Sequence, residues 1–135
     1  MTVRAPRRVE APALRSLQSL LSHADLDLIP AALDGPFCCR VAVDSGTVVG
    51  YAVALPGRET TLSELVVAPG HRREGHGRAL VAVVADAAAA ADRVVATTPA
   101  DGAVGFYESL GFEVETRLEG FYGSGTDALR LARRE

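Results

Sequence analysis

The chain has 135 residues, of which 48% are hydrophobic and 23% are charged, and this balance is typical of a folded globular protein rather than a disordered one. The length suffices for one hydrophobic core, so we expect a single domain over residues 1–135. A formal net charge of −3 argues against general nucleic-acid binding, because no overall positive field would attract phosphates.

The cysteines and histidines give no sign of a disulfide or a metal site. Cys38 and Cys39 are adjacent, so on a strand their side chains point to opposite faces. The histidines, His23, His71 and His76, do not stand in a metal-ligand spacing. The N-terminus lacks the apolar core of a signal peptide, and no window approaches the ~18 apolar residues that span a membrane. We expect a cytoplasmic protein that binds neither a metal nor a membrane.

The first third of the chain is expected to form a short strand and two helices. The strand is predicted over residues 3–9, and the first helix begins near Pro12. An apolar stripe packs this helix on the core: Leu14, Leu17, Leu20 and Leu21. A second helix is predicted over residues 25–33, and it ends at Asp34-Gly35-Pro36.

Three β-rich runs follow. Residues 37–43 and 47–55 are joined by Asp44-Ser45-Gly46, a sequence that favours a hairpin turn. Residues 61–67 form the next strand. The sequence therefore predicts a three-stranded meander that leads into a glycine-rich turn.

This turn, VAPGHRREGHGR over residues 67–78, is the most informative stretch of the chain. Gly75 and Gly77 remove side chains where a backbone approaches a ligand closely, and the following helix offers unpaired N–H groups and a positive dipole end. These features predict a phosphate site. The spacing fits neither a nucleotide P-loop, because Arg78 follows the last glycine, nor a dinucleotide fingerprint, which would need glycine at Leu80.

The remaining elements alternate between helices and strands. The helix after the turn is predicted to face the core with Leu80, Val83, Val84, Ala87, Ala88 and Ala91. A strand is expected over residues 92–96, and then a helix that starts at Thr98-Pro99 and ends at Gly111. The apolar stripe of that helix consists of Ala103, Phe106, Tyr107 and Leu110. Two more strands are predicted over residues 112–117 and 128–132.

Two segments resemble the GNAT superfamily of N-acetyltransferases. Arg72-x-x-Gly75-x-Gly77 is similar to the loop with which that family wraps the pyrophosphate of CoA. The run AVGFYESLGF over residues 103–112 is similar to the family's AxxFYExLGF element. The resemblance implies an α/β (α+β) fold with one mixed, mostly antiparallel, twisted sheet of about six or seven strands and about four flanking helices. The sheet is expected to open between its fourth and fifth strands.

The resemblance also implies acetyl-CoA as co-substrate, bound in the opened sheet. Its pantetheine arm would pair with the backbone of Leu65 and Val67. Its pyrophosphate would be held by the loop, that is by Arg72, Arg73, Gly75, His76, Gly77 and Arg78. Tyr107 stands at the family's position for the acid that protonates the CoA thiolate, and a core aromatic on the helix stripe is the alternative.

The sequence leaves the general base open. Glu64 is the only acid within the central strand, and alternation places it on the face opposite to Leu65 and Val67. An acid there could take the ammonium proton through a water, and it could equally be a hydrogen-bonded structural acid.

The tail points to a class of acceptor. Residues 121–128, FYGSGTDA, resemble a segment of the RimI-like branch, whose members acetylate protein N-terminal α-amines, and Tyr122 would line the peptide site. Two positions depart from the pattern of that branch. Val95 replaces the acid that is its usual candidate base, and Ala100 replaces an asparagine near the cofactor.

Three functions follow from the resemblance. The first is an N-terminal α-amine acetyltransferase, and the second is an acetyltransferase of a small-molecule amine such as a polyamine, an amino acid or an antibiotic. The third is a non-catalytic acyl-CoA-binding regulatory module. Retention of Tyr107 argues against the third, because a binding module needs no proton donor for a thiolate. The acceptor, the acyl length and the choice between monomer and homodimer stay open.

Overall fold

The computed structural model describes residues 2–35, 37–87, 92–123 and 125–135. Within these residues the chain forms one seven-stranded sheet with four α-helices and two short 3-10 helices, which confirms the expected α/β fold. The strands are β1 (Thr2–Arg4), β2 (Cys38–Asp44), β3 (Thr47–Leu55), β4 (Glu59–Val67), β5 (Arg93–Pro99), β6 (Glu113–Leu118) and β7 (Ala128–Arg134). The helices are α1 (Ala11–Gln18), α2 (Leu28–Asp34), α3 (His76–Ala87) and α4 (Val104–Ser109), with η1 (Arg8–Glu10) and η2 (Pro69–His71).

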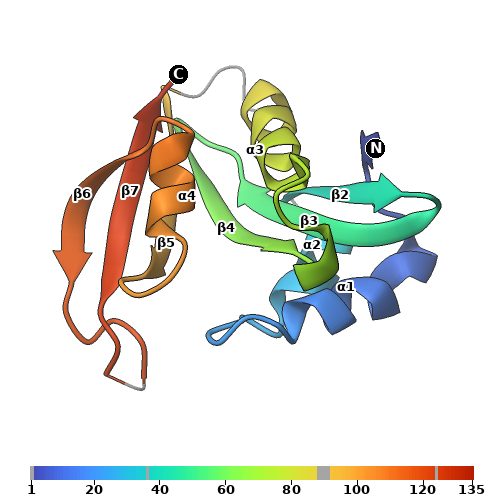
Figure 1. Cartoon of the computed structure of the whole chain (residues 1–135), viewed down its shortest axis with the longest axis horizontal. Coiled ribbons are helices and arrows are strands. Elements are labelled where there is room, and N and C mark those ends of the chain that lie inside the picture. Colours follow the sequence, from blue (N-terminus) through green and yellow to red (C-terminus); the bar gives the residue numbers. More distant parts are fainter. Residues whose placement is uncertain (1, 36, 88–91, 124) are drawn as a thin grey trace.

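The sheet is mixed and mostly antiparallel, in the order β1-β2-β3-β4-β5-β7-β6. Among the described strands, β4 and β5 form the one parallel pair, and only residues 59–62 of β4 take part in it. A bulge that leaves Ser63 unpaired against β3 lies where β4 and β5 part. The predicted opening between the fourth and fifth strands is therefore confirmed. Figure 1 shows β5, β6, β7 and α4 as a group beside β2, β3 and β4.

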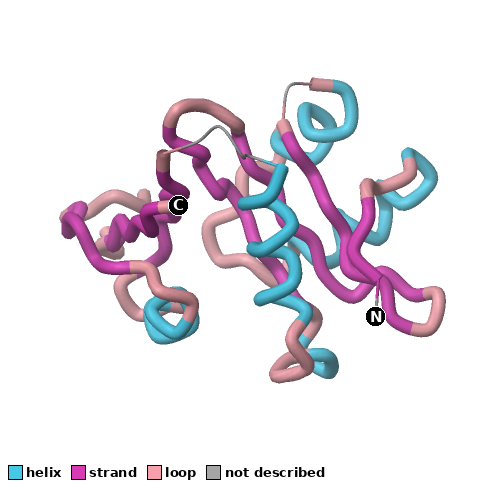
Figure 2. The backbone as a smooth tube through the Cα atoms, turned by 90° about the horizontal axis from the view of Figure 1, so that it is seen from above, coloured by secondary structure: helices cyan, strands magenta, loops and turns pink. Residues whose placement is uncertain are grey.

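The helices cover the two faces of the sheet unequally. α3 and α4 pack on one face, and Figure 2 shows one of them over each part of the sheet. α1 and α2 pack on the other face, where their core cluster takes in side chains of β2, β3 and β4 only. No described helix is long and apolar enough to cross a membrane.

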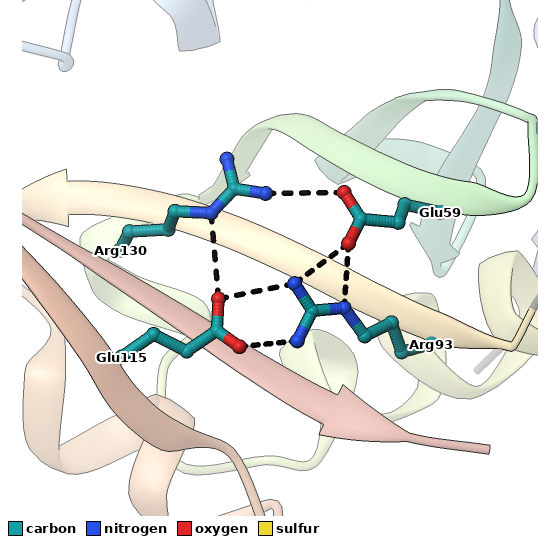
Figure 3. Close-up of polar contacts among 4 residues, drawn as sticks. All are labelled: Glu59, Arg93, Glu115 and Arg130. Carbon is teal, nitrogen blue, oxygen red and sulfur yellow. Dashed lines mark hydrogen bonds and ion pairs between the residues drawn. The ribbon is translucent and has the colours of Figure 1, made fainter.

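On the face of α1 and α2, the strands from β4 to β6 carry an ion-pair network in place of a further helix (Figure 3). Its members are Glu59, Arg93, Glu115 and Arg130. Arg93 pairs with Glu59 at 2.6 Å and also with Glu115, while Arg130 lies 3.1 Å from Glu59 and 3.5 Å from Glu115. Glu59 and Arg93 are register partners, so the network joins both parts of the sheet where β4 and β5 still pair.

The predicted meander is confirmed, and β3 has the predicted bounds. The turn between β2 and β3 has positive φ at Ser45 (52°) and Gly46 (79°), which is the conformation of a type I′ hairpin. The strand predicted over residues 3–9 is limited to β1. Pro6 lacks the N–H that a longer ladder would need, and the chain continues into η1 instead.

Both N-terminal helices are shorter than predicted. α1 ends at Gln18, so Leu20 is 47% exposed instead of buried. α2 starts later than Asp25, because the Asp25 backbone N–H donates to the carboxylate of Glu64. This contact holds the connection between the two helices, residues 19–27, against β4 in an irregular conformation.

α3 turns a different part of its surface to the core than predicted. Its buried apolar residues are Leu80, Val81 and Val84. The predicted Val83 is half-buried and Ala87 is exposed. Val81 and Val83 are equally apolar, so hydrophobic periodicity alone could not choose between them.

Of the residues named in the sequence analysis, those outside the described part of the chain are Pro36, Ala88, Ala91 and Ser124.

The predicted start of α4 is wrong. Thr98 and Pro99 are the last residues of β5, where they pair with β7, and the helix begins only at Val104. Pairing with a strand from the far end of the chain has outweighed the local helix-start signal. Gly111 follows the end of the helix with a φ of 90°, as expected for a glycine that stops a helix.

Candidate active site

The parting of β4 from β5 leaves backbone groups of β4 without a strand partner among the described residues. The Ala68 N–H donates to the Val49 carbonyl of β3 at 2.8 Å, so Ala68 points its backbone N–H toward β3. Because successive residues alternate, Leu65 and Val67 direct their N–H and C=O groups toward the opening. The Val67 carbonyl accepts a hydrogen bond from Arg72 Nε at 3.1 Å, which agrees with this direction.

A cavity of about 740 Å³ lies at this opening, within the size range of small-molecule sites. Every residue that the sequence analysis assigned to CoA lines it: Leu65, Val67, Arg72, Arg73, Gly75, His76, Gly77 and Arg78. Tyr107 lines it as well, whereas Glu64 and Tyr122 do not. Leu20 and Leu21 of the α1–α2 connection also line it, although the sequence placed them in a core stripe.

The turn from β4 to α3 needs glycine at two positions. Gly75 has a φ of 88°, in the left-handed region that favours glycine. At Gly77 a Cβ atom would lie 3.0 Å from the ring of Phe106, so a side chain there would disturb the contact with α4. α3 begins at His76, next to both glycines, and its first N–H groups and positive dipole end lie at the cavity. This arrangement suits a phosphate.

Tyr107 reaches the cavity from α4, on the side opposite to β4. It is 7% exposed and packs edge-to-face against Phe106 and Phe112, with ring centroids 5.3 Å and 5.4 Å away. Burial, with a smaller contribution from Tyr122, raises the pKa of Tyr107 to about 12. The phenol therefore keeps its proton at neutral pH, as a proton donor must.

Glu64 lies on the face of β4 that α1 covers, opposite to Leu65 and Val67 as predicted, and is 8% exposed. Its carboxylate accepts hydrogen bonds from Tyr51 Oη at 2.8 Å, from Gln18 Nε2 at 3.0 Å and from the Asp25 backbone N–H at 3.0 Å. These donors use most of the acceptor capacity of the carboxylate. The contacts tie α1, the α1–α2 connection, β3 and β4 together.

Gln18 was missed by the sequence analysis. It is 3% exposed, and its amide donates both to Glu64 and to the Asp25 carbonyl, at 2.8 Å in the second case. A signal was available, because Gln18 follows Leu14 by one helical turn and so is a polar residue on the apolar stripe of α1.

Tyr122 belongs to the connection between β6 and β7 and stacks on His23 of the α1–α2 connection. The two ring centroids are 4.0 Å apart and the rings are inclined by 16°. Phe121 packs edge-on against Tyr122 at 5.0 Å. Leu20 and Leu21, which precede His23 in the α1–α2 connection, line the cavity, so this connection runs from the cavity wall to the stack.

At the two positions that depart from the RimI-like pattern, Val95 and Ala100, the side chains offer neither a base nor a polar contact. Val95 is 1% exposed on β5, and since its neighbours Val94 and Ala96 pack toward α3, it lies on the same face of the sheet as Glu64. The Ala100 backbone N–H donates to the Asp127 carbonyl at 2.9 Å. Among the described residues, Glu64 is the one buried acid.

The turn also gathers groups that could hold a metal ion. One ligand atom from each of Asp44, His71, Glu74 and His76 lies within 4.8 Å of the others. This grouping could not be predicted from residue spacing, because Asp44 is distant from the turn along the chain. The buried ring of His76 is directed to Glu74, at 3.3 Å, which leaves its backbone N–H as the group available to a phosphate.

Backbone groups of β4 that lack a strand partner among the described residues, the start of α3 and the phenol of Tyr107 lie around one cavity. Such an arrangement suits an acyltransferase. A match to a family model narrows this class. A family model described as acetyltransferase (GNAT) domain matches residues 35–114, more than half of the chain. The chain belongs to the GNAT acetyltransferase family.

Solved structures of N-acetyltransferases share this fold. The ribosomal-protein-S18-alanine N-acetyltransferase from Escherichia coli gives a TM-score of 0.85 at 23% identity, over 98% of this chain and 92% of that one. NAA60 from Arabidopsis thaliana, in complex with a bisubstrate analogue, gives a TM-score of 0.89 at 17% identity, over 98% of this chain and 97% of that one. The NatC complex bound to Gag peptide and CoA gives a TM-score of 0.83 at 20% identity, over 99% of this chain and 98% of that one. No curated protein sequence matches the chain.

Proposed function

We propose that the chain transfers the acetyl group of acetyl-CoA directly to the N-terminal α-amine of a protein or peptide. The observation that carries this proposal is the cavity between β4 and α4, which the glycine-rich turn and Tyr107 line together. The pyrophosphate of CoA would lie at the start of α3. The acetylated arm would then run past Leu65 and Val67 and bring its thioester to Tyr107.

The reaction needs three events at the thioester. The neutral amine attacks the carbonyl carbon, a backbone N–H of β4 near Val67 stabilises the oxyanion, and the carbon–sulfur bond then breaks. Tyr107 donates its proton to the departing thiolate and regains one from solvent. The ammonium proton leaves to water, and the products are an N-acetylated amine and CoA.

The apolar residue Val95 supports an α-amine rather than a Lys-type amine as acceptor. An α-amine has a pKa of about 7.7–8.0, so roughly a tenth of it is neutral at pH 7 without help. A Lys-type amine has a pKa of about 10.4, so fewer than about one molecule in a thousand is neutral, and such an acceptor depends on an efficient base. With Val95 on β5 and the Glu64 carboxylate occupied by three donors, the site suits the acceptor that needs less deprotonation.

The surface beside the His23–Tyr122 stack supports a peptide rather than a small amine. Leu26 and Phe121 belong to the two loops that meet there, and they are 78% and 55% exposed. Exposed apolar side chains next to an active-site cavity can bind the first side chains of a peptide. In this arrangement Tyr122 would contact the acceptor, and Glu64 would hold the α1–α2 connection in place.

Release of free thiol from acetyl-CoA tests the proposal. The purified chain is assayed with short Lys-containing peptides that have free N-termini, with the same peptides N-terminally blocked, and with polyamines, amino acids and aminoglycosides. We expect turnover on the free peptides and none on the blocked ones. Activity confined to small amines would contradict the proposed acceptor. CoA binding without thiol release from any acceptor would contradict the transferase and favour a regulatory module.

A further inference from the structure

We propose that Asp44, His71, Glu74 and His76 form a structural zinc site that fixes the turn between β4 and α3 to the β2–β3 hairpin. Asp44 ends β2, and the other three residues lie in the turn and at the start of α3. The proposal rests on the geometry and chemistry of these four side chains, and it holds whether or not the proposed acetyl transfer does.

The ligand atoms lie close to the separations of a tetrahedral zinc site. With zinc bonds of about 2.0–2.2 Å, tetrahedral geometry separates neighbouring ligand atoms by about 3.3–3.6 Å. Glu74 Oε1 lies 3.3 Å from His71 Nδ1 and 3.3 Å from His76 Nε2. His71 Nδ1 lies 3.7 Å from Asp44 Oδ2. Since all four atoms are within 4.8 Å of one another, small rotations of the carboxylates would complete the site.

The imidazole nitrogens give a second, independent indication. His71 Nδ1 is buried and, although it lies close to two carboxylates, it has no hydrogen-bond partner among the described residues. Buried polar atoms are almost always paired, so this nitrogen calls for a partner. The ring of His76 is 2% exposed and directs Nε2 into the cluster, 3.3 Å from Glu74 Oε1. A cation between the four groups would supply the partner of His71.

The donor set suits zinc in charge and in type. Two carboxylates balance the double positive charge, and two imidazoles favour zinc over magnesium and calcium, which prefer oxygen ligands. Four protein ligands would fill the tetrahedron, as in structural rather than catalytic zinc sites. The bound ion would cross-link the hairpin to the segment that carries Gly75 and Gly77.

Zinc binding by the untagged chain, first stripped with a chelator, tests this inference. Zn²⁺ is titrated in competition with a chromophoric chelator. We expect one equivalent to bind to the wild type, and binding weakened by at least about tenfold in His71→Ala and in Glu74→Gln. Bound zinc should also raise the unfolding midpoint of the wild type and not that of the two variants. Replacement of the buried His76 could unfold the chain, so the test does not depend on it.

His23→Ala and Cys38→Ser are the matched controls. His23 is the histidine of the chain that lies outside the cluster, and Cys38 is a half-buried thiol at the opposite end of β2 from Asp44. Both variants should bind zinc as tightly as the wild type, and Mg²⁺ should not compete. The proposal is overturned if the wild type binds no zinc, if His71→Ala binds it equally well, or if binding is lost only in a control.

Discussion

Tyr107 is enclosed by two phenylalanines and still opens onto the cavity. The enclosure favours the neutral phenol, because an aromatic surrounding does not solvate a phenolate. In the proposed reaction, the opening would let the proton reach the CoA thiolate. Phenylalanine at this position would keep the ring packing and remove only the hydroxyl group, so one substitution separates the chemical role from the structural one.

Tyr107→Phe is expected to lower kcat by about 10²–10⁴ while the Kd of CoA changes little, because a general acid acts in the transition state and not in binding. Steady-state thiol release and calorimetric titration with CoA measure the two quantities. Tyr122→Phe is the control, since it keeps a ring against His23. Equal losses in kcat and in affinity would show that Tyr107 serves only the packing.

Glu64→Gln keeps the size of the side chain and one acceptor oxygen but removes the charge. If Glu64 positions the α1–α2 connection, as its three donors indicate, the variant should lose about 1–3 kcal/mol of stability. Its activity should fall by the same factor at every pH. Chemical denaturation and a pH profile of kcat/KM check both statements.

Tyr51→Phe is the control for Glu64, because it removes one of the three donors and leaves the carboxylate. It should lower stability and leave the shape of the pH profile unchanged. If the rise of kcat/KM with pH disappears in Glu64→Gln and not in Tyr51→Phe, the general base is instead Glu64.

At the scale of elements, α3 and α4 meet at Gly77, where a Cβ atom would stand 3.0 Å from Phe106. Gly77→Val should therefore push the start of α3 away from α4 and weaken CoA binding by about 5–150-fold, the range that overpacking of about 1–3 kcal/mol gives. Gly105→Ala is the control: a Cβ there meets nothing within 4 Å, and the variant should keep its CoA affinity. An unchanged Kd in Gly77→Val would remove the pyrophosphate assignment.

The ion-pair network of Figure 3 holds strands that none of the described helices covers on that face. Arg93 contacts two of its members, so Arg93→Met should lower the unfolding midpoint, and added salt should shrink the difference from the wild type. Arg15→Met is the control, because Arg15 is exposed on α1 and has no ion pair among the described residues. Thermal unfolding at low and high salt measures the effect, and a difference that salt does not change would assign it to lost packing.

Elements whose cause is local could be predicted from the sequence. The β2–β3 hairpin follows from Ser45 and Gly46, and the turn into α3 follows from its glycines. The helix ends were misjudged where a distant residue decides. Asp25 is held by Glu64 of β4, and Thr98 pairs with β7, so neither could be placed from its neighbours in the chain.

The residues of the candidate site also fall into those that could be predicted from the sequence and those that could not. The groups assigned to CoA come from one continuous segment, and they lie together along the cavity. The acceptor side depends on the meeting of two loops, at His23 and Tyr122, and on the contact between Gln18 and Glu64. The cluster around His71 likewise needs Asp44, which comes from the β2–β3 hairpin. No periodicity or spacing encodes such encounters.

At the scale of the whole molecule, stability should fall in alkaline solution. Burial raises the pKa of Tyr107 to about 12 and also raises the pKa of Tyr51, whereas tyrosines in the unfolded chain titrate near about 10. Above that pH the unfolded chain binds fewer protons than the folded one, so the free energy of unfolding should decrease as pH rises from about 10 to about 12. Denaturant titrations across this range measure it. Tyr107→Phe should show a smaller decrease, and an identical one would exclude a contribution from this phenol.

Beyond Leu62, β4 is a strand edge in the interior of the sheet rather than at its rim. Exposed edges invite pairing with other molecules, and proteins commonly guard them with charges, bulges or short length. Here the edge faces a cavity that α4 lines on its other side, so it lies inside the sheet and not on an open rim. In the proposed complex an extended ligand arm would lie along this edge, and the position of the edge would also hinder pairing with a strand of another molecule.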